Sequence, residues 1–512
     1  MKIIKFFGKL GISLSLLDAI IILNIIFITL YVWRSYPLTT LRADSYQYLI
    51  GILWVKYFRP PMTLMDYTTG ATLMGMVLGN ILGARVDLYY WAALYILVAI
   101  NILIYIMLLK ITKRRIVAFG GSIIMAASYF GIFGMCVQGI YANMMERVVA
   151  LIFLIPSFIL LHLFLENGKK KYLAYSVAMF LFSTVLWHWG TTLIVLFFFY
   201  PVLKGLYEDS FKKIYKYILI GLPYLIITGT IEYLQNMYIP EFGPKGYTLT
   251  EFILNPGKYQ YLSDMLRQLV YFNSYPLLLN GLKYSFVQGR IFDPYGLISD
   301  LPSIRKLTVP VLVFYTLLTA YTYKVLPKVR PFFVTVVLTF VSLLFLNCFL
   351  QRYIPSTQAG SHRYLHMPAV IFAFYWAIAL WAVFWRHKSA IVKFLGLGFL
   401  GFYVWVNTLL IDSNFEHLFA WDHSAGIVIN YVSKMNTAGM ENTLIVGPYP
   451  EFQPYESYFF SQYKKGKNIR FVDNYSFFED ELTWKDIAPA YDHLIMLEYN
   501  KDCGCVLEKK VR

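Results

Sequence analysis

The sequence has little charge. Only 14% of its 512 residues are charged and 58% are hydrophobic, whereas a soluble globular domain carries about 25% charged residues. It also lacks the P-loop, GxGxxG, HExxH and GxSxG patterns that mark phosphate, dinucleotide, zinc-protease and serine-hydrolase chemistry. These shortages exclude an ordinary soluble enzyme of those classes and indicate a membrane protein.

Cysteine is scarce as well, with four residues in the chain. Two of them, Cys503 and Cys505, flank a single glycine near the C-terminus. A disulfide between such near neighbours is strained, and no second Cys/His pair offers a zinc site. We therefore expect ordinary surface thiols.

What the sequence has instead is a series of apolar runs, each about as long as the 17 to 25 residues that cross a bilayer as a helix. The first run follows the basic stretch MKIIKFFGK but is longer than a signal-peptide core and lacks a small-residue cleavage site, so we expect it to be retained. The runs predict about eleven transmembrane helices, near residues 10–33, 89–109, 116–136, 148–165, 172–187, 190–204, 218–235, 307–323, 331–350, 366–385 and 394–411.

Basic residues gather in every second connection between these runs. If the N-terminus is cytoplasmic, the inner connections are 110–115, 168–171, 204–216, 324–330 and 385–393, and each is short and basic. This is the positive-inside pattern, so we expect a multi-pass protein of the cytoplasmic membrane. Contact of these connections with anionic lipid explains the net positive charge without any nucleic-acid partner.

Charge also divides the chain near residue 411. Residues 412–512 hold 15 acidic and 10 basic residues, whereas residues 1–411 hold 14 acidic and 35 basic ones. The segments ENTLIVGPYP, NIRFVD and HLIMLEY read as strands and SYFFSQYKK as a helix. The predicted fold is therefore mainly α, with a transmembrane catalytic domain (1–411) that carries outer loops 34–88 and 236–306, and a small extracytoplasmic α/β domain (412–512).

Two acids fall on the predicted outer side. Asp44 follows the first run, where an Asp-Ser pair is also good helix N-cap chemistry. Glu146 stands at the mouth of the fourth run, where an acid is costly unless it faces a cavity or a partner such as the adjacent Arg147. Each acid alone is explained by local structure; together they indicate a site at the membrane surface.

Cations and histidines fall on the same predicted side. His188 lies in the turn WHWG, Arg352 begins the connection after the ninth run, and His362 and Arg363 end it. Guanidinium groups bind phosphate oxygens through two hydrogen bonds, so these residues could hold an anionic lipid headgroup. Interfacial anchoring is the simpler alternative for each of them.

The order and spacing of RADSYQY, MERVVAL with GKKKYL behind it, WHWG and SHRYLHMP resembles the GT-C superfamily of integral membrane glycosyltransferases. This superfamily includes protein O-mannosyltransferases, the lipid A aminoarabinose transferase and oligosaccharyltransferase catalytic subunits. The resemblance implies a polyprenyl- or dolichyl-phosphate-linked sugar donor and a lipid, glycan or protein acceptor.

The resemblance also implies residue roles. Asp44 matches the catalytic first-loop acid and Glu146 the second acid, although many relatives have paired acids in that loop, which leaves Asp66 as another partner. His188, Arg352, His362 and Arg363 would lie near the donor phosphate. No metal is required, but Asp44 and Glu146 are the pair that would hold Mg²⁺ or Mn²⁺.

Two other functions fit parts of the pattern. An O-antigen polymerase or ligase acting on lipid-linked oligosaccharide would depend on the outer arginines and histidines and on loop 236–306. A lipid or sugar transporter would carry no chemistry, but such proteins place charges at the midplane and often contain repeats, neither of which dominates here.

Overall fold

A computed structural model gives the fold of the chain. For several residues at helix ends, Glu146 and Arg352 among them, it describes the backbone but not the side chain. The described residues are 15–34, 86–127, 144–186, 189–209, 211–238, 302–353, 367–409, 431, 435, 440–447, 469–473, 484–500 and 502–511.

The chain forms two compact units. Unit 1 consists of Met1–Arg34, Tyr95–Met135 and Arg147–Asn414, and unit 2 of Ser35–Leu94, Cys136–Glu146 and Phe415–Arg512. The described part of unit 1 is helical, and that of unit 2 contains a sheet. Each unit is considered by itself below.

Every predicted apolar run overlaps a helix. Four helical segments are long and apolar enough to cross a membrane: Leu94–Thr112, Val149–Asn167, Ile214–Ile231 and Ala390–Leu409. A fifth is reached if Leu312–Val325 and Pro327–Ser342, between which the direction changes by 102°, count as one span. The chain is thus a candidate membrane protein, and the figure of about eleven spans stays a prediction. The labelled helices are α2 (Leu16–Val32), α5 (Val86–Thr112), α6 (Arg115–Ala127), α9 (Met144–Asn167), α10 (Lys170–Leu186), α11 (Trp189–Glu208), α12 (Ile214–Tyr238), α17 (Pro302–Val325), α18 (Arg330–Tyr353) and α19 (Met367–Leu380).

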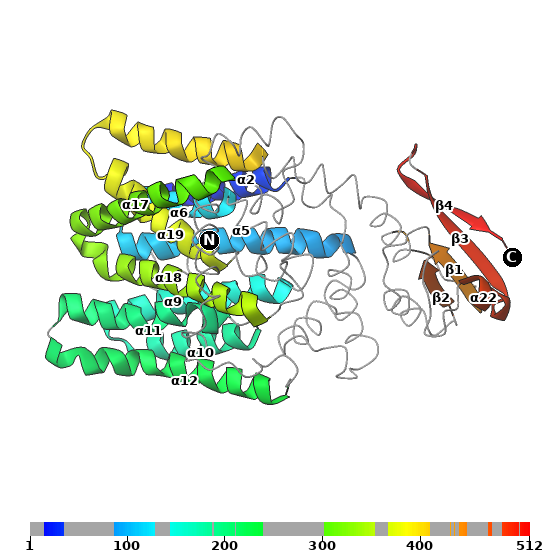
Figure 1. The fold of residues 1–512 in the computed structure, drawn as a ribbon, viewed down its shortest axis with the longest axis horizontal. Coiled ribbons are helices and arrows are strands. Elements are labelled where there is room, and N and C mark those ends of the chain that lie inside the picture. The colour runs from blue at the N-terminus through cyan, green and yellow to red at the C-terminus, as the bar shows by residue number, and fades with distance from the viewer. Residues whose placement is uncertain are drawn as a thin grey trace. The chain divides into compact units, whose positions relative to one another are not determined.

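The turns that join these helices meet at one end of unit 1 (Figure 1). They carry the basic segments named above, so the geometry gathers the positive charge at a single end, as the positive-inside pattern requires. This end is called the basic end below. Three contacts tie its turns together: Lys113 Nζ to Glu166 Oε1 at 3.0 Å, the Tyr207 hydroxyl to the Tyr323 hydroxyl at 2.9 Å, and Arg386 Nη2 to the Tyr321 hydroxyl at 3.0 Å.

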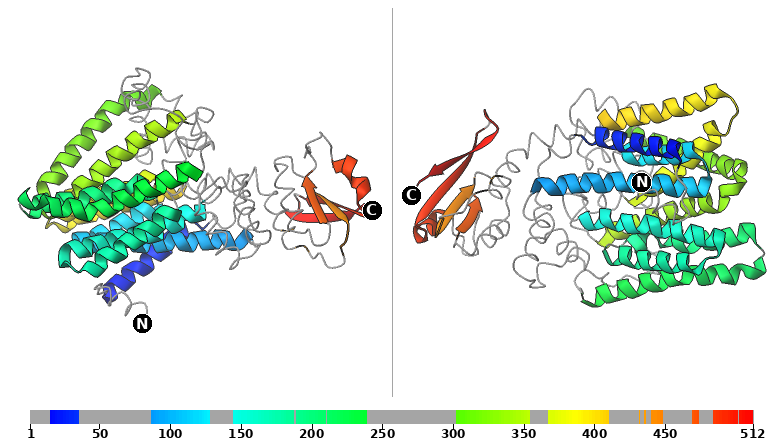
Figure 2. Two further views of the ribbon diagram at one scale, coloured as in Figure 1. Left: turned by 90° about the horizontal axis from the view of Figure 1, so that it is seen from below. Right: turned by 180° about the vertical axis from the view of Figure 1, so that it is seen from behind.

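Aromatic rings fill the space between the helices of unit 1, which run side by side (Figure 2). Phe197 of α11 has its ring centroid 5.4 Å from that of Phe158, 4.7 Å from that of Phe180 and 5.1 Å from that of Tyr224. All four are buried. Tilted and edge-on ring pairs of this kind add about 0.5–1.5 kcal/mol each beyond the area that they bury, and here they join α9, α10, α11 and α12.

Close packing of another kind joins α6 to the segment after α19. A Cβ atom on Gly120 would lie 2.5 Å from the ring of Trp385, so only glycine allows this approach. Residues Trp381–Trp385 form a π-helix, in which the Arg386 N–H donates to the Trp381 carbonyl at 3.0 Å. Such a turn holds one extra residue compared with an α-helix.

Unit 2 contains a four-stranded sheet in the order β2-β1-β3-β4 (Figure 1). Strand β1 pairs in parallel with β2 and β3, and β3 pairs antiparallel with β4. Three strands fall on the three predicted ones and confirm them, whereas β4 was not predicted; the predicted helix SYFFSQYKK lies outside the described residues. The strands are β1 (Thr443–Gly447), β2 (Ile469–Asp473), β3 (His493–Asn500) and β4 (Cys505–Lys510).

The central strand β1 is buried along its whole length, as expected for a strand with parallel neighbours on both sides. Leu444 and Val446 form a small core with Leu494 of β3. Partly buried residues from the short helices α22 (Trp484–Ile487) and η9 (Ala488–Ala490) pack against that core.

The expectation of free surface thiols at Cys503 and Cys505 is wrong, because the two are joined by a disulfide. The β3–β4 hairpin reverses the chain between them, and Gly504 takes the left-handed backbone conformation, with φ at +59°. The two Cα atoms come to 5.2 Å, a separation that an ordinary disulfide spans.

Candidate functional site

Most residues of the predicted catalytic site lie outside the described residues; they are Asp44, Asp66, His188, His362 and Arg363. Two others have a described backbone only. Glu146 is in the first turn of α9, and Arg352 is in the last turn of α18. Their roles in catalysis stay predictions.

The helix ends next to the predicted cations lie together in unit 1. Helix α18 packs between α11 and α19: the Phe332 ring centroid is 5.9 Å from that of Tyr200 and 6.0 Å from that of Phe374. Because α18 starts at the basic end and both neighbours finish there, the other ends of all three share the opposite end of unit 1. These ends are Trp189 in α11, directly after His188; Tyr353 in α18, directly after Arg352; and Met367 in α19, four residues after Arg363.

At the basic end, Asp18 of α2 is a buried carboxylate whose side chain is 1% exposed. Its Oδ2 accepts hydrogen bonds from the Ser15 N–H at 2.8 Å and the Ser15 hydroxyl at 2.7 Å, so the two residues form a capping box. Its Oδ1 accepts from the Tyr105 hydroxyl at 2.7 Å and from Arg115 Nε at 2.7 Å. With these donors in place, the carboxylate is a structural group and not a free base.

A second polar group crosses the same end. His162, which is 3% exposed, has Nδ1 2.6 Å from the Tyr200 hydroxyl and Nε2 3.4 Å from Glu166 Oε1. The second distance is long for a hydrogen bond, so it is mainly an electrostatic contact. Glu166 in turn pairs with Lys113, whose side chain is 60% exposed. The chain of contacts runs from a buried tyrosine to solvent and joins α9, α11 and the α5–α6 turn.

Sequence reasoning missed both groups as pairings. Asp18 was noted as an acid near the inner side, but its partner Arg115 is 97 residues away, and nothing local links the two. His162 lies inside an apolar run, with Glu166 at the (i, i+4) spacing that places two side chains on one helix face. That spacing is the signal that could have found the pair.

Among the described residues there is no group of three or more His, Cys, Asp or Glu that could hold a metal ion. The pair that the sequence assigns to Mg²⁺ or Mn²⁺, Asp44 with Glu146, has no described side chains. Metal binding there stays a prediction.

No protein-family model and no curated protein matches the chain. The likeness to membrane glycosyltransferases therefore depends on the quoted motifs and on their order along the chain. The function below is argued from those motifs and from the distribution of charge in unit 1.

Proposed function

We propose that the chain is an integral membrane glycosyltransferase of the GT-C type. It moves a sugar from a polyprenyl-phosphate-linked donor to an acceptor hydroxyl on the extracytoplasmic face of the cytoplasmic membrane. The acceptor is a lipid, glycan or protein, and the membrane itself holds the prenyl tail of the donor.

The observation that carries the proposal is the separation of charge along unit 1. The basic turns meet at one end, where the acids Asp18 and Glu166 are paired with cations. The helix ends nearest to His188, Arg352 and Arg363 lie at the other end. A transferase that uses a lipid-linked donor on the outer surface needs its reactive groups at the end away from the cytoplasmic lysines and arginines.

Asp44 acts as the general base. It takes the proton of the acceptor hydroxyl as the oxygen attacks the anomeric carbon, while the bond from that carbon to the lipid phosphate breaks. Arg352, Arg363 and His188 stabilise the negative charge that develops on the departing phosphate. Attack from the side opposite the leaving group inverts the anomeric centre.

Glu146 orients the acceptor or shares the base role with Asp44. The transfer needs no metal, since one base and a good leaving group complete it. If a divalent cation is bound, these two carboxylates are the expected ligands, and oxygen donors of this type suit Mg²⁺ or Mn²⁺.

The test is to supply the purified chain in detergent with polyprenyl-phosphate sugars and to measure the release of polyprenyl phosphate. Asp44→Asn should lower turnover by about 100-fold or more, the range that general bases contribute. Glu208→Gln is the matched control, because Glu208 pairs with Lys204 at the basic end at 2.8 Å and is half exposed. Unchanged turnover in a folded Asp44→Asn variant removes the base assignment.

The same assay separates the two alternatives. Loss of activity in Arg352→Ala with full activity in Asp44→Asn favours a polymerase or ligase that uses lipid-linked oligosaccharide. Movement of the intact sugar lipid across vesicles, with no release of polyprenyl phosphate, favours a transporter.

A further inference from the structure

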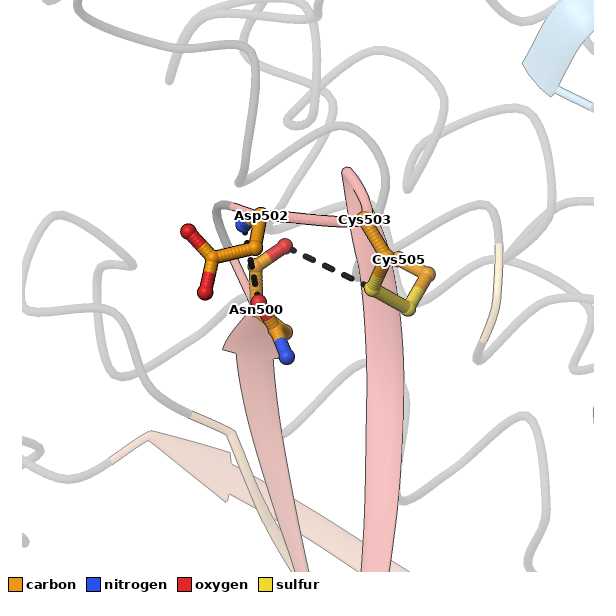
Figure 3. Close-up of a disulfide and its surroundings, with 4 residues drawn as sticks. All are labelled: Asn500, Asp502, Cys503 and Cys505. Carbon is orange, nitrogen blue, oxygen red and sulfur yellow. Dashed lines mark hydrogen bonds between the residues drawn. A yellow bond between two sulfur atoms is a disulfide. The ribbon is translucent and has the colours of Figure 1, made fainter.

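The disulfide between Cys503 and Cys505 closes a loop with one residue between its ends (Figure 3). A crosslink stabilises a fold mainly by restricting the unfolded chain, and the effect grows with the logarithm of the loop length. A loop this short is therefore among the weakest staples that a disulfide can form. Stability does not account for two cysteines at these positions.

The hairpin holds the two cysteines together without help from the bond. Strands β3 and β4 are paired from Ile495 opposite Lys510 to Asn500 opposite Cys505. The turn is closed by the Asp502 N–H, which donates to Asn500 Oδ1 at 2.8 Å (Figure 3). Breaking the disulfide would leave this pairing and this turn in place.

Solvent reaches the two sulfur-bearing residues unequally. Cys503 is exposed, whereas Cys505 is partly buried at the start of β4. The Cys503 Sγ also lies 3.8 Å from the Asn500 carbonyl oxygen, and this contact fixes where the sulfur sits on the turn (Figure 3). An incoming thiolate would therefore meet Cys503 first.

We propose that Cys503 and Cys505 form a reversible dithiol–disulfide couple that exchanges with external thiols. A thiolate attacks Cys503 Sγ, the bond between the two cysteines breaks, and Cys505 leaves as a thiolate that takes up a proton. A second thiol then attacks its partner's sulfur in the mixed disulfide and releases Cys503. Two external thiols are oxidised to one disulfide, and the pair gains two electrons and two protons. This inference is independent of the proposed transferase activity.

The test uses the full chain in detergent with Cys136→Ser and Cys348→Ser, so that only the pair reports. The protein is equilibrated without denaturant in glutathione buffers of increasing reduced fraction, or in dithiothreitol as the dithiol probe. It is then quenched with acid and alkylated with a maleimide that shifts its mass. We expect both cysteines to become reactive within the glutathione series, with the far-ultraviolet circular dichroism spectrum unchanged.

Three results would overturn the proposal. One is a pair that stays oxidised in reduced glutathione until denaturant is added. Another is a loss of the sheet signal that accompanies reduction, which would make the bond a staple. The third is full alkylation of protein isolated without reductant, which would show that no disulfide forms.

A matched pair of single variants tests the direction of attack. Cys505→Ser leaves the exposed Cys503 thiol, and Cys503→Ser leaves the partly buried Cys505 thiol. In oxidised glutathione, the variant that keeps Cys503 should form the mixed disulfide several-fold faster, because access limits such exchange. Equal or reversed rates would contradict the assignment of Cys503 as the attacked sulfur.

Discussion

Arg115 holds Asp18 through two hydrogen bonds, from Nε to Oδ1 at 2.7 Å and from Nη2 to Oδ2 at 3.2 Å. This fork joins the first turn of α2 to the first turn of α6. Because Tyr105 of α5 donates to the same carboxylate, one buried acid connects three helices. The start of the first described helix is thereby fixed at the basic end of unit 1.

Replacing that acid should destabilise the protein. Asp18→Ala removes the capping box, which is worth about 1 kcal/mol, and leaves the buried Tyr105 hydroxyl without its acceptor, which costs about 1–3 kcal/mol. We expect the free energy of unfolding to fall by about 3 kcal/mol, measured by thermal or denaturant unfolding in detergent. Glu208→Ala, at a half-exposed pair, should show no measurable change, and equal stability of both variants would contradict the role given to Asp18.

Two glycines offer a matched comparison of packing. Gly120→Ala brings a methyl group against the buried ring of Trp385 and should cost about 1–3 kcal/mol, the usual range for overpacking. Gly398→Ala has open space around its new Cβ and should change stability by less than about 1 kcal/mol. The melting temperatures of both variants, measured in one detergent, test the contact between α6 and the π-helical segment.

Labelling of single cysteines tests the orientation of the chain. In a background without native cysteines, Lys169→Cys probes the exposed α9–α10 turn and Leu507→Cys probes β4, where the side chain is 46% exposed. An impermeant maleimide should label Leu507→Cys in intact cells and Lys169→Cys only after the membrane is opened. The reverse order of labelling would invert the topology and remove the extracytoplasmic site.

The C-terminal unit should lose stability in alkali. Burial, and then a hydrogen bond to Glu508, raise the pKa of Tyr431 above its ordinary value of 10.0. A raised pKa in the folded state favours folding while the tyrosine is protonated, and this contribution is lost as the pH rises above about 10. Unfolding followed by circular dichroism between pH 8 and pH 11 should show a decline in the wild type that Tyr431→Phe reduces. Equal pH profiles for the two proteins would contradict the contact.

The helices could be predicted from the sequence because a run of apolar residues has a single structural outcome in a membrane. The predicted run 148–165, for example, lies within α9, which extends from Met144 to Asn167. Boundaries were less accurate, since polar residues such as Glu166 and Asn167 continue a helix beyond its apolar part. The number of spans depends on how much of each helix meets lipid, and hydropathy alone does not fix it.

Strand β4 escaped prediction because it is an edge strand with mostly exposed residues. Its sequence CVLEKK is half charged, which is common at sheet edges, where lysines prevent further pairing. The disulfide was missed for a related reason. The local spacing of Cys503 and Cys505 argues against a bond, and only the hairpin register and the backbone of Gly504 make it possible.

The candidate site shows the same limit. Sequence motifs named Asp44 and Glu146, but pairings between distant residues carry no local signal, as Asp18 with Arg115 shows. The acids that the motifs single out differ from the acids whose partners are described. Asp18 and Glu166 are held by cations at the basic end, and this leaves the role of a base to the predicted outer acids.

The π-helical turn at Trp381–Trp385 makes the length of that segment as constrained as its composition. Deleting one residue there would restore a regular α-helix and rotate everything after it by about 100°, the angle between successive residues. Arg386 would then turn away from the Tyr321 hydroxyl that it now contacts at 3.0 Å. A gene variant lacking a single codon in this stretch would uncouple the last described helix of unit 1 from α17, even if every remaining side chain were conserved.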